Sequence, residues 1–175
     1  MNVLETERLN LRKLRIDDAP FMLGLLNEPS FIENIGDRGV RTMEGARQYI
    51  ATGAIASYEQ HGFGLYLVEL KDTAVPIGIC GLVKRPFLEN ADVGFAFLPQ
   101  FWSQGYALES ASAVKRYARE QLGIDRVVAI VSPGNEPSIR LLHKLGLQFE
   151  CMIETHQPGD HAALFTPATP DRGSP

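Results

Sequence analysis

The chain has 175 residues, of which 45% are hydrophobic, and carries a net charge of −4. This length and composition suffice for the buried core of one globular domain. The slight acidity argues against direct nucleic-acid binding, because the phosphate backbone requires a cationic surface. No apolar run approaches the roughly 18 residues of a membrane span, and the N-terminus lacks the apolar core of a signal peptide. We therefore expect a cytoplasmic protein without a membrane partner.

The first half of the chain combines strand and helix patterns. Residues 9–13 alternate as a strand does, and Asp17 and Asp18 then precede a helical pattern as cap candidates. A longer helix is predicted between Thr42, another cap candidate, and Tyr58, because apolar residues recur there at helical spacing. Strand-like runs follow at 63–71, 76–85 and 91–98. A polar turn joins the first two, which predicts a hairpin extended into a meander by the third.

The second half predicts helices and strands in alternation. These are an amphipathic helix at 107–121, an apolar central strand at 126–131, a helix from Asn135 to a stop at Gly146, and strands at 149–154 and 162–166. We expect one α/β domain over residues 1–166 and a disordered, proline-rich tail at 167–175. The element order predicts a mixed, mostly antiparallel sheet with flanking helices and one strand–helix–strand crossover beginning at Phe97.

The crossover contains a loop of small residues where its helix starts. The loop reads Ser103-Gln-Gly-Tyr-Ala107 and has no Lys or Arg. The first amides of a helix lack intrahelical acceptors and carry the positive end of the dipole, so they bind anions without a side-chain cation. Gly105 allows close approach of a ligand to the backbone. Since neither GxxxxGK[ST] nor GxGxxG occurs, the loop favours a diphosphate held mainly by amides, with a plain tight turn as the alternative.

A second helix start is predicted beside the first. Residues 135–138, Asn-Glu-Pro-Ser, open a helix at the end of the strand 126–131, which neighbours the strand that leads into the loop. Adjacent parallel strands that each end at a helix start form the crevice where ligands bind in such sheets. We therefore expect these two strands to splay around a ligand.

Four motifs in this order resemble the GNAT superfamily of acyl-CoA-dependent N-acetyltransferases, and within it the branch that acetylates the N-termini of ribosomal proteins. They are Thr6-Glu-Arg-Leu-Asn-Leu-Arg12, Asp92-Val-Gly-Phe95, Phe101-Trp-Ser-Gln-Gly-Tyr-Ala-Leu-Glu109, and Asn135-Glu-Pro-Ser138 continuing to Lys144-Leu-Gly146. The superfamily pattern [RQ]-x-x-G-x-[GA] falls on residues 102–107. Trp102 replaces the usual Arg or Gln, and Ser103 stands where this branch usually has Gly. The likeness extends over about residues 3–166.

The resemblance implies the GNAT fold, with splayed central parallel strands, and acetyl-CoA as cosubstrate with no metal. It implies that the coenzyme A pyrophosphate is held by the amides of Ser103, Gln104, Gly105, Tyr106, Ala107 and Leu108. It also implies that the backbone at Ala96 and Phe97 pairs with the pantetheine arm as an additional strand would. Asn135 is expected to hold the cofactor arm, with helix capping as its alternative role.

Direct acetyl transfer requires a neutral amine, a polarised thioester carbonyl and protonation of the leaving thiolate. Many GNAT enzymes take that proton from a Tyr at the position of Leu142, so this acid is missing here. The resemblance implies that Ser138 replaces it, although a helix-start hydroxyl has a structural role as well. Asp92 is the candidate general base, because GNAT enzymes often carry a carboxylate there.

Other bases remain open at this stage. They are Tyr66, Glu69, Glu154 and His156. The late carboxylate that the ribosomal enzymes use falls on Gln157 here. Cys80 lies in an apolar strand, which raises the pKa of a thiol, and Cys151 has no neighbouring His in sequence, so neither is expected to act as a nucleophile. Their spacing predicts no zinc site or disulfide.

The sequence therefore predicts an enzyme that transfers acetyl directly from acetyl-CoA to a primary amine, on a protein N-terminus or a small molecule. A noncatalytic acyl-CoA-binding or sensing module is the alternative favoured by the missing Tyr, and a protein-interaction domain without cofactor is a third. The segments 28–41 and 157–161, which are expected to select the acceptor, carry no readable code. The acceptor, and the choice between monomer and homodimer, stay open.

Overall fold

A computed structural model describes residues 1–168 of the chain. The strands are β1 (Asn2–Glu5), β2 (Leu9–Lys13), β3 (Leu65–Leu70), β4 (Pro76–Val83), β5 (Asp92–Phe97), β6 (Ala129–Val131), β7 (Leu147–Glu154) and β8 (His161–Pro167). The helices are α1 (Ala19–Leu26), α2 (Pro29–Asn34), α3 (Met43–Ile50), α4 (Ala56–His61), α5 (Tyr106–Leu122) and α6 (Glu136–Lys144). No helix in this part of the chain is long and apolar enough to cross a membrane.

The strands form two sheets that meet along one edge. Strands β1 to β5 pair in chain order, all antiparallel, and the small sheet has the order β6-β8-β7. A single parallel bridge, between Asp92 and Val128, joins β5 to the strand that leads into β6. The predicted mixed, mostly antiparallel sheet with one parallel junction is confirmed.

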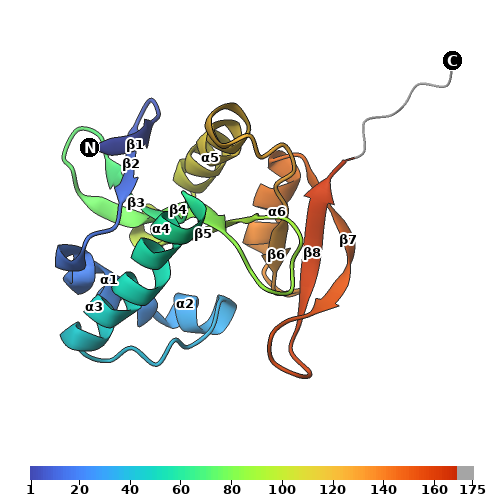
Figure 1. The fold of residues 1–175 in the computed structure, drawn as a ribbon, viewed down its shortest axis with the longest axis horizontal. Coiled ribbons are helices and arrows are strands. Elements are labelled where there is room, and N and C mark those ends of the chain that lie inside the picture. The colour runs from blue at the N-terminus through green and yellow to red at the C-terminus, as the bar shows by residue number, and fades with distance from the viewer. Residues whose placement is uncertain (169–175) are drawn as a thin grey trace, which may run out of the picture.

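The large sheet separates two layers of helices (Figure 1). On one face Tyr66 of β3 belongs to the same core cluster as Val114 of α5. On the other face Leu67, the next residue of β3, packs in a second cluster with Ile50 of α3. Successive side chains of a strand point to opposite faces, so β3 contributes to both layers and reads as an almost continuous apolar run.

The structure contains elements that the sequence did not predict. Strand β1 is only four residues long and half exposed, and α2 is a six-residue helix with a proline at its first position. The long helix predicted from Thr42 to Tyr58 is a continuous rod, but a π-helical turn at Ala51–Ile55 separates α3 from α4. Single π-helical turns within α-helices are frequent at functional sites.

Asp18 occupies the N-cap position of α1, with Pro20 in the first turn as predicted, but its side chain makes no capping hydrogen bond there. Its carboxylate does not cap α1 but accepts the backbone N–H of Arg15 at 2.7 Å and two guanidinium N–H groups of Arg12, at 2.8 and 2.9 Å. Arg12 also donates to Glu69 at 2.9 Å. This partly buried ion-pair network fixes β2 and β3 to the start of the helical layer. The carboxylate of Asp18 binds Arg12 and not the first amides of α1 because the guanidinium lies within hydrogen-bond distance.

A hydrogen bond connects α5 to the end of α6, directly before the small sheet continues with β7. Lys115 of α5 donates to the carbonyl of Leu145 at 2.6 Å, at the C-terminal end of α6, where a cation complements the helix dipole. At the end of the chain, β8 continues through Pro167, which pairs with Leu147, so the predicted tail starts one residue too early. Residues 169–175 of that tail lie outside the described residues. The assignment of residues 1–166 to a single domain stays a prediction.

Candidate active site

The candidate site is the splay between β5 and β6. The N–H of Val93 donates to the carbonyl of Val128 at 2.9 Å, and the N–H of Val128 donates to Ala91 at 3.1 Å. Beyond Val93 no further backbone bond joins β5 to β6 within residues 1–168. The two strands therefore separate toward their C-terminal ends, where α5 and α6 begin, as the sequence predicted.

The register of β5 fixes which backbone groups face the open side. Leu98, directly after β5, donates its N–H to the carbonyl of Ile77 in β4 at 3.0 Å, whereas Val93 donates to Val128, away from β4. Alternate residues of a strand direct their peptide groups to opposite sides. Even-numbered residues of this strand thus bond β4, and odd-numbered residues face the splay.

This alternation divides the predicted pantetheine-binding residues. Ala96 is paired with Ile79, so its peptide groups are used within the sheet. The peptide groups that face the splay belong to Phe97, as predicted, and to Phe95, which sequence reasoning missed. The sequence could have predicted Phe95, because the peptide groups that a strand directs to one side recur at every second residue, two positions before Phe97.

The loop between β5 and α5 has the backbone of an anion site. Gly105 is the N-cap residue of α5 and has a left-handed conformation (φ 83°), with no side-chain acceptor for the first amides of the helix. Ser103 is also left-handed (φ 60°), a conformation that costs a non-glycine residue about 1 kcal/mol. The amides of Tyr106, Ala107 and Leu108 lie in the first turn and have no intrahelical acceptors. These residues were predicted to bind a diphosphate, and the assignment remains a prediction.

The structure brings a cation to this loop from another part of the chain. Arg8, in the turn between β1 and β2, donates Nη1–H to the carbonyl of Gln104 at 2.9 Å, and its guanidinium lies 4.4 Å from the ring centroid of Tyr106. Glu109 holds this guanidinium at 2.7 Å. Sequence reasoning missed this role because 101 residues separate Arg8 from Glu109. The loop itself contains no Lys or Arg, and the cation beside it comes from the turn between β1 and β2.

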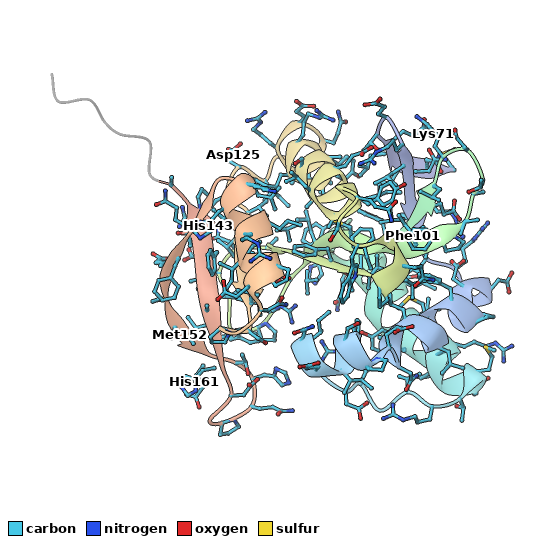
Figure 2. The ribbon with its side chains drawn as sticks, turned by 180° about the vertical axis from the view of Figure 1, so that it is seen from behind. Lys71, Phe101, Asp125, His143, Met152 and His161 are labelled. Carbon is cyan, nitrogen blue, oxygen red and sulfur yellow. The ribbon has the colours of Figure 1, made fainter. Side chains whose placement is uncertain are left out.

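Trp102 connects the loop back to β5. Its indole N–H donates to the carbonyl of Phe97 at 2.8 Å, while the side chain stays 47% exposed. Phe101, beside it in the short turn before α5, is labelled in Figure 2. The position that carries Arg or Gln in the superfamily pattern thus holds a side chain that fixes the last peptide of the strand.

Helix α6 begins on the other side of the splay. The side-chain oxygen of Asn135 accepts the N–H of Ser138 at 3.4 Å, so the capping role of Asn135 is observed. The half-buried hydroxyl of Ser138 makes no hydrogen bond within residues 1–168. Leu142, at the position of the Tyr acid, is 1% exposed and belongs to the core. The role of Ser138 as the acid stays a prediction.

Asp92 lies at the start of β5 and is 1% exposed. Burial raises the pKa of this carboxyl, and the neighbouring Arg85 opposes that effect. The Nε–H of Arg85 donates to Asp92 at 2.9 Å. A raised pKa suits a group that must accept a proton, and the contact with Arg85 uses only Oδ1 of the carboxylate. The role of general base stays a prediction.

The other candidate bases lie in separate places. Tyr66 is buried under α5, stacked on Tyr58 at 5.7 Å between ring centroids, and burial raises its pKa far above the usual range. Glu69 is used by Arg12. His156 stacks on Phe87 at 6.2 Å between ring centroids, so the β7–β8 turn touches the loop between β4 and β5.

Glu154 and Gln157 belong to the same β7–β8 turn. Glu154 accepts the N–H of Gly159 at 2.9 Å, and the carbonyl of Gln157 accepts the N–H of Asp160 at 3.0 Å. Figure 2 shows His161 and Met152 on this small sheet, on the opposite side of the molecule from Lys71. These contacts shape the turn, and the carboxylate of Glu154 is already hydrogen-bonded within it.

The two cysteines lie in different environments. Cys80 is fully buried in β4, and burial raises the pKa of its thiol to about 12. Cys151 is exposed on β7. The predicted upward shift of the Cys80 pKa is confirmed. In the part of the chain that the structure describes, no group of three or more His, Cys, Asp or Glu side chains is arranged to hold a metal ion.

A cleft of about 340 Å³ lies on the face of the large sheet opposite α5. Its wall is formed by α3, the π-helical turn and α4, and its floor by β3 and β4. Ile79 of the floor pairs with Ala96, and directly opposed residues of an antiparallel pair share a face of the sheet. The cleft therefore adjoins β5 from the side opposite the α5 layer.

A largely antiparallel sheet that splays at one parallel junction, with an amide-rich helix start at its end, defines an acyltransferase of the GNAT class. The family of the acetyltransferase (GNAT) domain matches residues 8–148, and the chain belongs to this family. It is 30% identical over 156 residues to a protein described as the uncharacterised N-acetyltransferase YoaA of Bacillus subtilis (strain 168), covering 88% of this chain and 87% of that protein.

Solved structures show the same fold. An acetyltransferase from Agrobacterium tumefaciens str. C58 is 23% identical with a TM-score of 0.79, over 95% of this chain and 94% of that one. RimL, a ribosomal L7/L12 α-N-protein acetyltransferase solved in complex with coenzyme A, is 16% identical with a TM-score of 0.81, over 95% and 97% of the two chains. The predicted GNAT fold is confirmed.

Proposed function

We propose that this acetyltransferase transfers the acetyl group of acetyl-CoA directly to a primary amine, on a protein N-terminus or a small molecule. The observation that carries this proposal is the splay itself. The peptide groups of Phe95 and the N–H of Phe97, which have no backbone partner within residues 1–168, face the same opening as the first turn of α5, while the carbonyl of Phe97 accepts from Trp102. A pantetheine arm has amides that extend such a strand, and a pyrophosphate matches such a helix start.

The cofactor assignments follow from this placement. The amides of residues 103–108 hold the pyrophosphate, and Arg8 adds a positive charge beside them. Phe95 and Phe97 bond the pantetheine arm, while Ala96 between them contributes its side-chain face. Within residues 1–168 only the oxygen of the Asn135 side chain is used, in the cap, so its amide N–H₂ group can donate to the arm. No metal is required by this chemistry.

The reaction forms one bond and breaks one. The neutral amine attacks the thioester carbonyl carbon, a C–N bond forms, and the C–S bond breaks to release the thiolate of coenzyme A. Ser138 passes a proton to that thiolate and is reprotonated from solvent, and the proton lost by the amine passes to Asp92 and from there to solvent. Ser138 is supported by its unpaired hydroxyl at the start of α6, and Asp92 by the burial that raises its pKa.

A noncatalytic acyl-CoA-binding module is the second candidate, because Leu142 fills the Tyr position with a buried apolar side chain. Mass-spectrometric screening of an amine and peptide library with purified protein and acetyl-CoA separates the two. Acetylated product together with free coenzyme A supports the enzyme. Calorimetric binding of acetyl-CoA without turnover of any amine would establish the sensing module instead.

We further propose that the chain is close to the ribosomal-protein N-terminal branch. This rests on the motifs at residues 6–12 and 101–109 and is in keeping with the fold shared with RimL. A cytoplasmic location, and a monomeric or homodimeric state without nucleic acid, complete the proposal. Sedimentation velocity of the purified chain measures the oligomeric state directly.

A further inference from the structure

The cleft beside β5 has an unbalanced charge. Four basic side chains line it: Arg38, His61, Lys84 and Arg85. Within residues 1–168 no Asp or Glu lines it. An amine acceptor that is a polycation would therefore meet like charges, which cost several kcal/mol when brought together in such a site.

The partners of these cations decide how much charge remains. Lys84 donates to the carbonyls of Leu88 and Glu89, at 2.8 and 2.6 Å, and these neutral acceptors leave its charge uncancelled. Arg85 is paired with Asp92 but remains 28% exposed. Arg38 is exposed and has no ion pair within the described residues. The cleft thus keeps at least two uncompensated positive charges, on Arg38 and Lys84.

Asp92 gives Arg85 a fixed orientation. Only the Nε–H of Arg85 is used by the carboxylate of Asp92. Its two terminal NH₂ groups have no partner within residues 1–168 and can bind a carboxylate in the bidentate manner that arginine favours. Arg38 faces the same cleft from the segment between α2 and α3. One preorganised and one exposed arginine therefore line the same cleft and are available to bind an anion there.

We propose that the acceptor is an amine that carries a carboxylate, and that Arg38 and Arg85 hold this carboxylate while the amine lies toward β5. The proposal rests on the acetyl transfer proposed above. A volume of about 340 Å³ fits a ligand the size of an amino acid or a short peptide end. Ile79 of the cleft floor is paired with Ala96, so a ligand of this size reaches the strand that holds the thioester arm.

A graded series of acceptors with one carbon skeleton tests the proposal. L-glutamate, L-glutamine and L-glutaminamide carry two, one and no carboxylates, and coenzyme A release is measured at equal fractions of neutral amine. We expect kcat/KM to fall about tenfold between L-glutamine and L-glutaminamide, where the last carboxylate is lost, the effect of one charge-assisted hydrogen bond. Spermidine is expected to be the poorest acceptor. Equal or better use of L-glutaminamide or spermidine would overturn the proposal.

A variant of the unpaired arginine localises the effect. Arg38→Gln is expected to lower kcat/KM for L-glutamate about tenfold and to leave the value for L-glutaminamide unchanged. Arg47→Gln, on the exposed surface of α3 and outside the cleft, is the matched control. An equal loss for both acceptors in Arg38→Gln contradicts the assignment. Activity with glutamyl-glutamate above that with L-glutamate identifies a peptide end as the source of the anion, and the reverse identifies a free amino acid.

Binding separates this proposal from the proposed function. If acetyl-CoA binds but no amine is acetylated, the enzyme function fails, and the cleft is then tested by titrating the protein saturated with coenzyme A with N-acetyl-L-glutamate. Calorimetric binding that Arg38→Gln abolishes upholds the anion site without turnover. The absence of binding overturns it.

Discussion

Glu109 in the first turn of α5 holds Arg8 of the N-terminal turn in a close ion pair through one carboxylate oxygen. The Nε–H and Nη2–H groups of Arg8 lie 2.7 Å from Oε2, and Oε1 accepts the backbone N–H of Arg8 at 2.9 Å and the hydroxyl of Thr6 at 2.6 Å. The third guanidinium nitrogen is left to bind Gln104 in the loop before α5. The N-terminal turn therefore fixes both the shape and the charge of the candidate pyrophosphate site.

Arg8→Lys is expected to weaken acetyl-CoA binding about three- to tenfold, because an ammonium cannot bridge Glu109 and Gln104 as the planar guanidinium does. Isothermal calorimetry with acetyl-CoA measures the change. Arg47→Lys on α3 is the control, since it alters an exposed pair far from the loop. Unchanged affinity in folded Arg8→Lys protein would remove Arg8 from the site.

Gly105→Val is expected to weaken acetyl-CoA binding at least tenfold, about 1.4 kcal/mol. The position has φ 83°, and a Cβ there would lie 3.2 Å from Nη2 of Arg8, so the substitution strains the loop and displaces the cation. Gly123→Val is the matched control, because it places the same strain (φ 66°) at the other end of α5 in open space. Equal affinities in the two folded variants would contradict the role of the loop.

Ser138→Ala is expected to lower kcat about a hundredfold, the usual contribution of a general acid, with the dissociation constant of acetyl-CoA nearly unchanged. Steady-state rates and calorimetry together give both values. Ser138→Thr keeps the hydroxyl and should retain most of the rate. A parallel loss of affinity in Ser138→Ala would instead indicate that the residue only supports the start of α6.

Direct transfer predicts intersecting lines in initial-velocity plots with varied acetyl-CoA and amine. A ping-pong route needs a nucleophile, and the buried thiol of Cys80, with its pKa raised to about 12, is unsuited to that role. Cys80→Ala and Cys151→Ala should therefore keep most of the wild-type kcat. Parallel lines together with a trapped acetyl-cysteine would replace direct transfer by a covalent route.

The ion pair at Glu109 predicts a pH-dependent stability. Burial pushes the pKa of Glu109 upward, but the hydrogen bonds from Thr6 and Arg8 outweigh it and hold the pKa below its ordinary value. Its stabilisation is thus present above the ordinary pKa of about 4.3 and is lost as the pH falls through the lower folded value. We expect Glu109→Gln to unfold about 1–2 kcal/mol more easily near pH 7.

Urea unfolding of wild type and Glu109→Gln at several pH values between 7 and 3 checks this expectation. The difference in unfolding free energy should be constant at the upper end and shrink at the acid end. Glu44→Gln, whose carboxylate is 81% exposed and 3.4 Å from its partner Arg47, is the control and should show little difference throughout. A difference that persists unchanged at pH 3 would show that Glu109 acts through packing and not through its charge.

The sequence by itself determined the larger strands, the long helices and the two helix starts beside the splay. Hydrophobic spacing over a few residues decides these features, as in β4 and α5, because a strand or helix buries the face that its own period creates. The loop at residues 103–107 was equally visible, since free amides at a helix start are a local property. Short elements such as β1 and α2 escaped because they depend on neighbours for stability.

Only the tertiary structure decided the charges around the site. Arg8 meets Glu109 across 101 residues, and Arg85 meets Asp92 across a turn. The cations of the cleft come from segments that no spacing rule connects. The peptide groups of Ala96 face β4 and those of Phe95 face the splay, and this difference likewise depends on the register of β5 against β4. Packing of distant segments fixes each of these relationships, and electrostatic interactions follow distance in space and not separation along the chain.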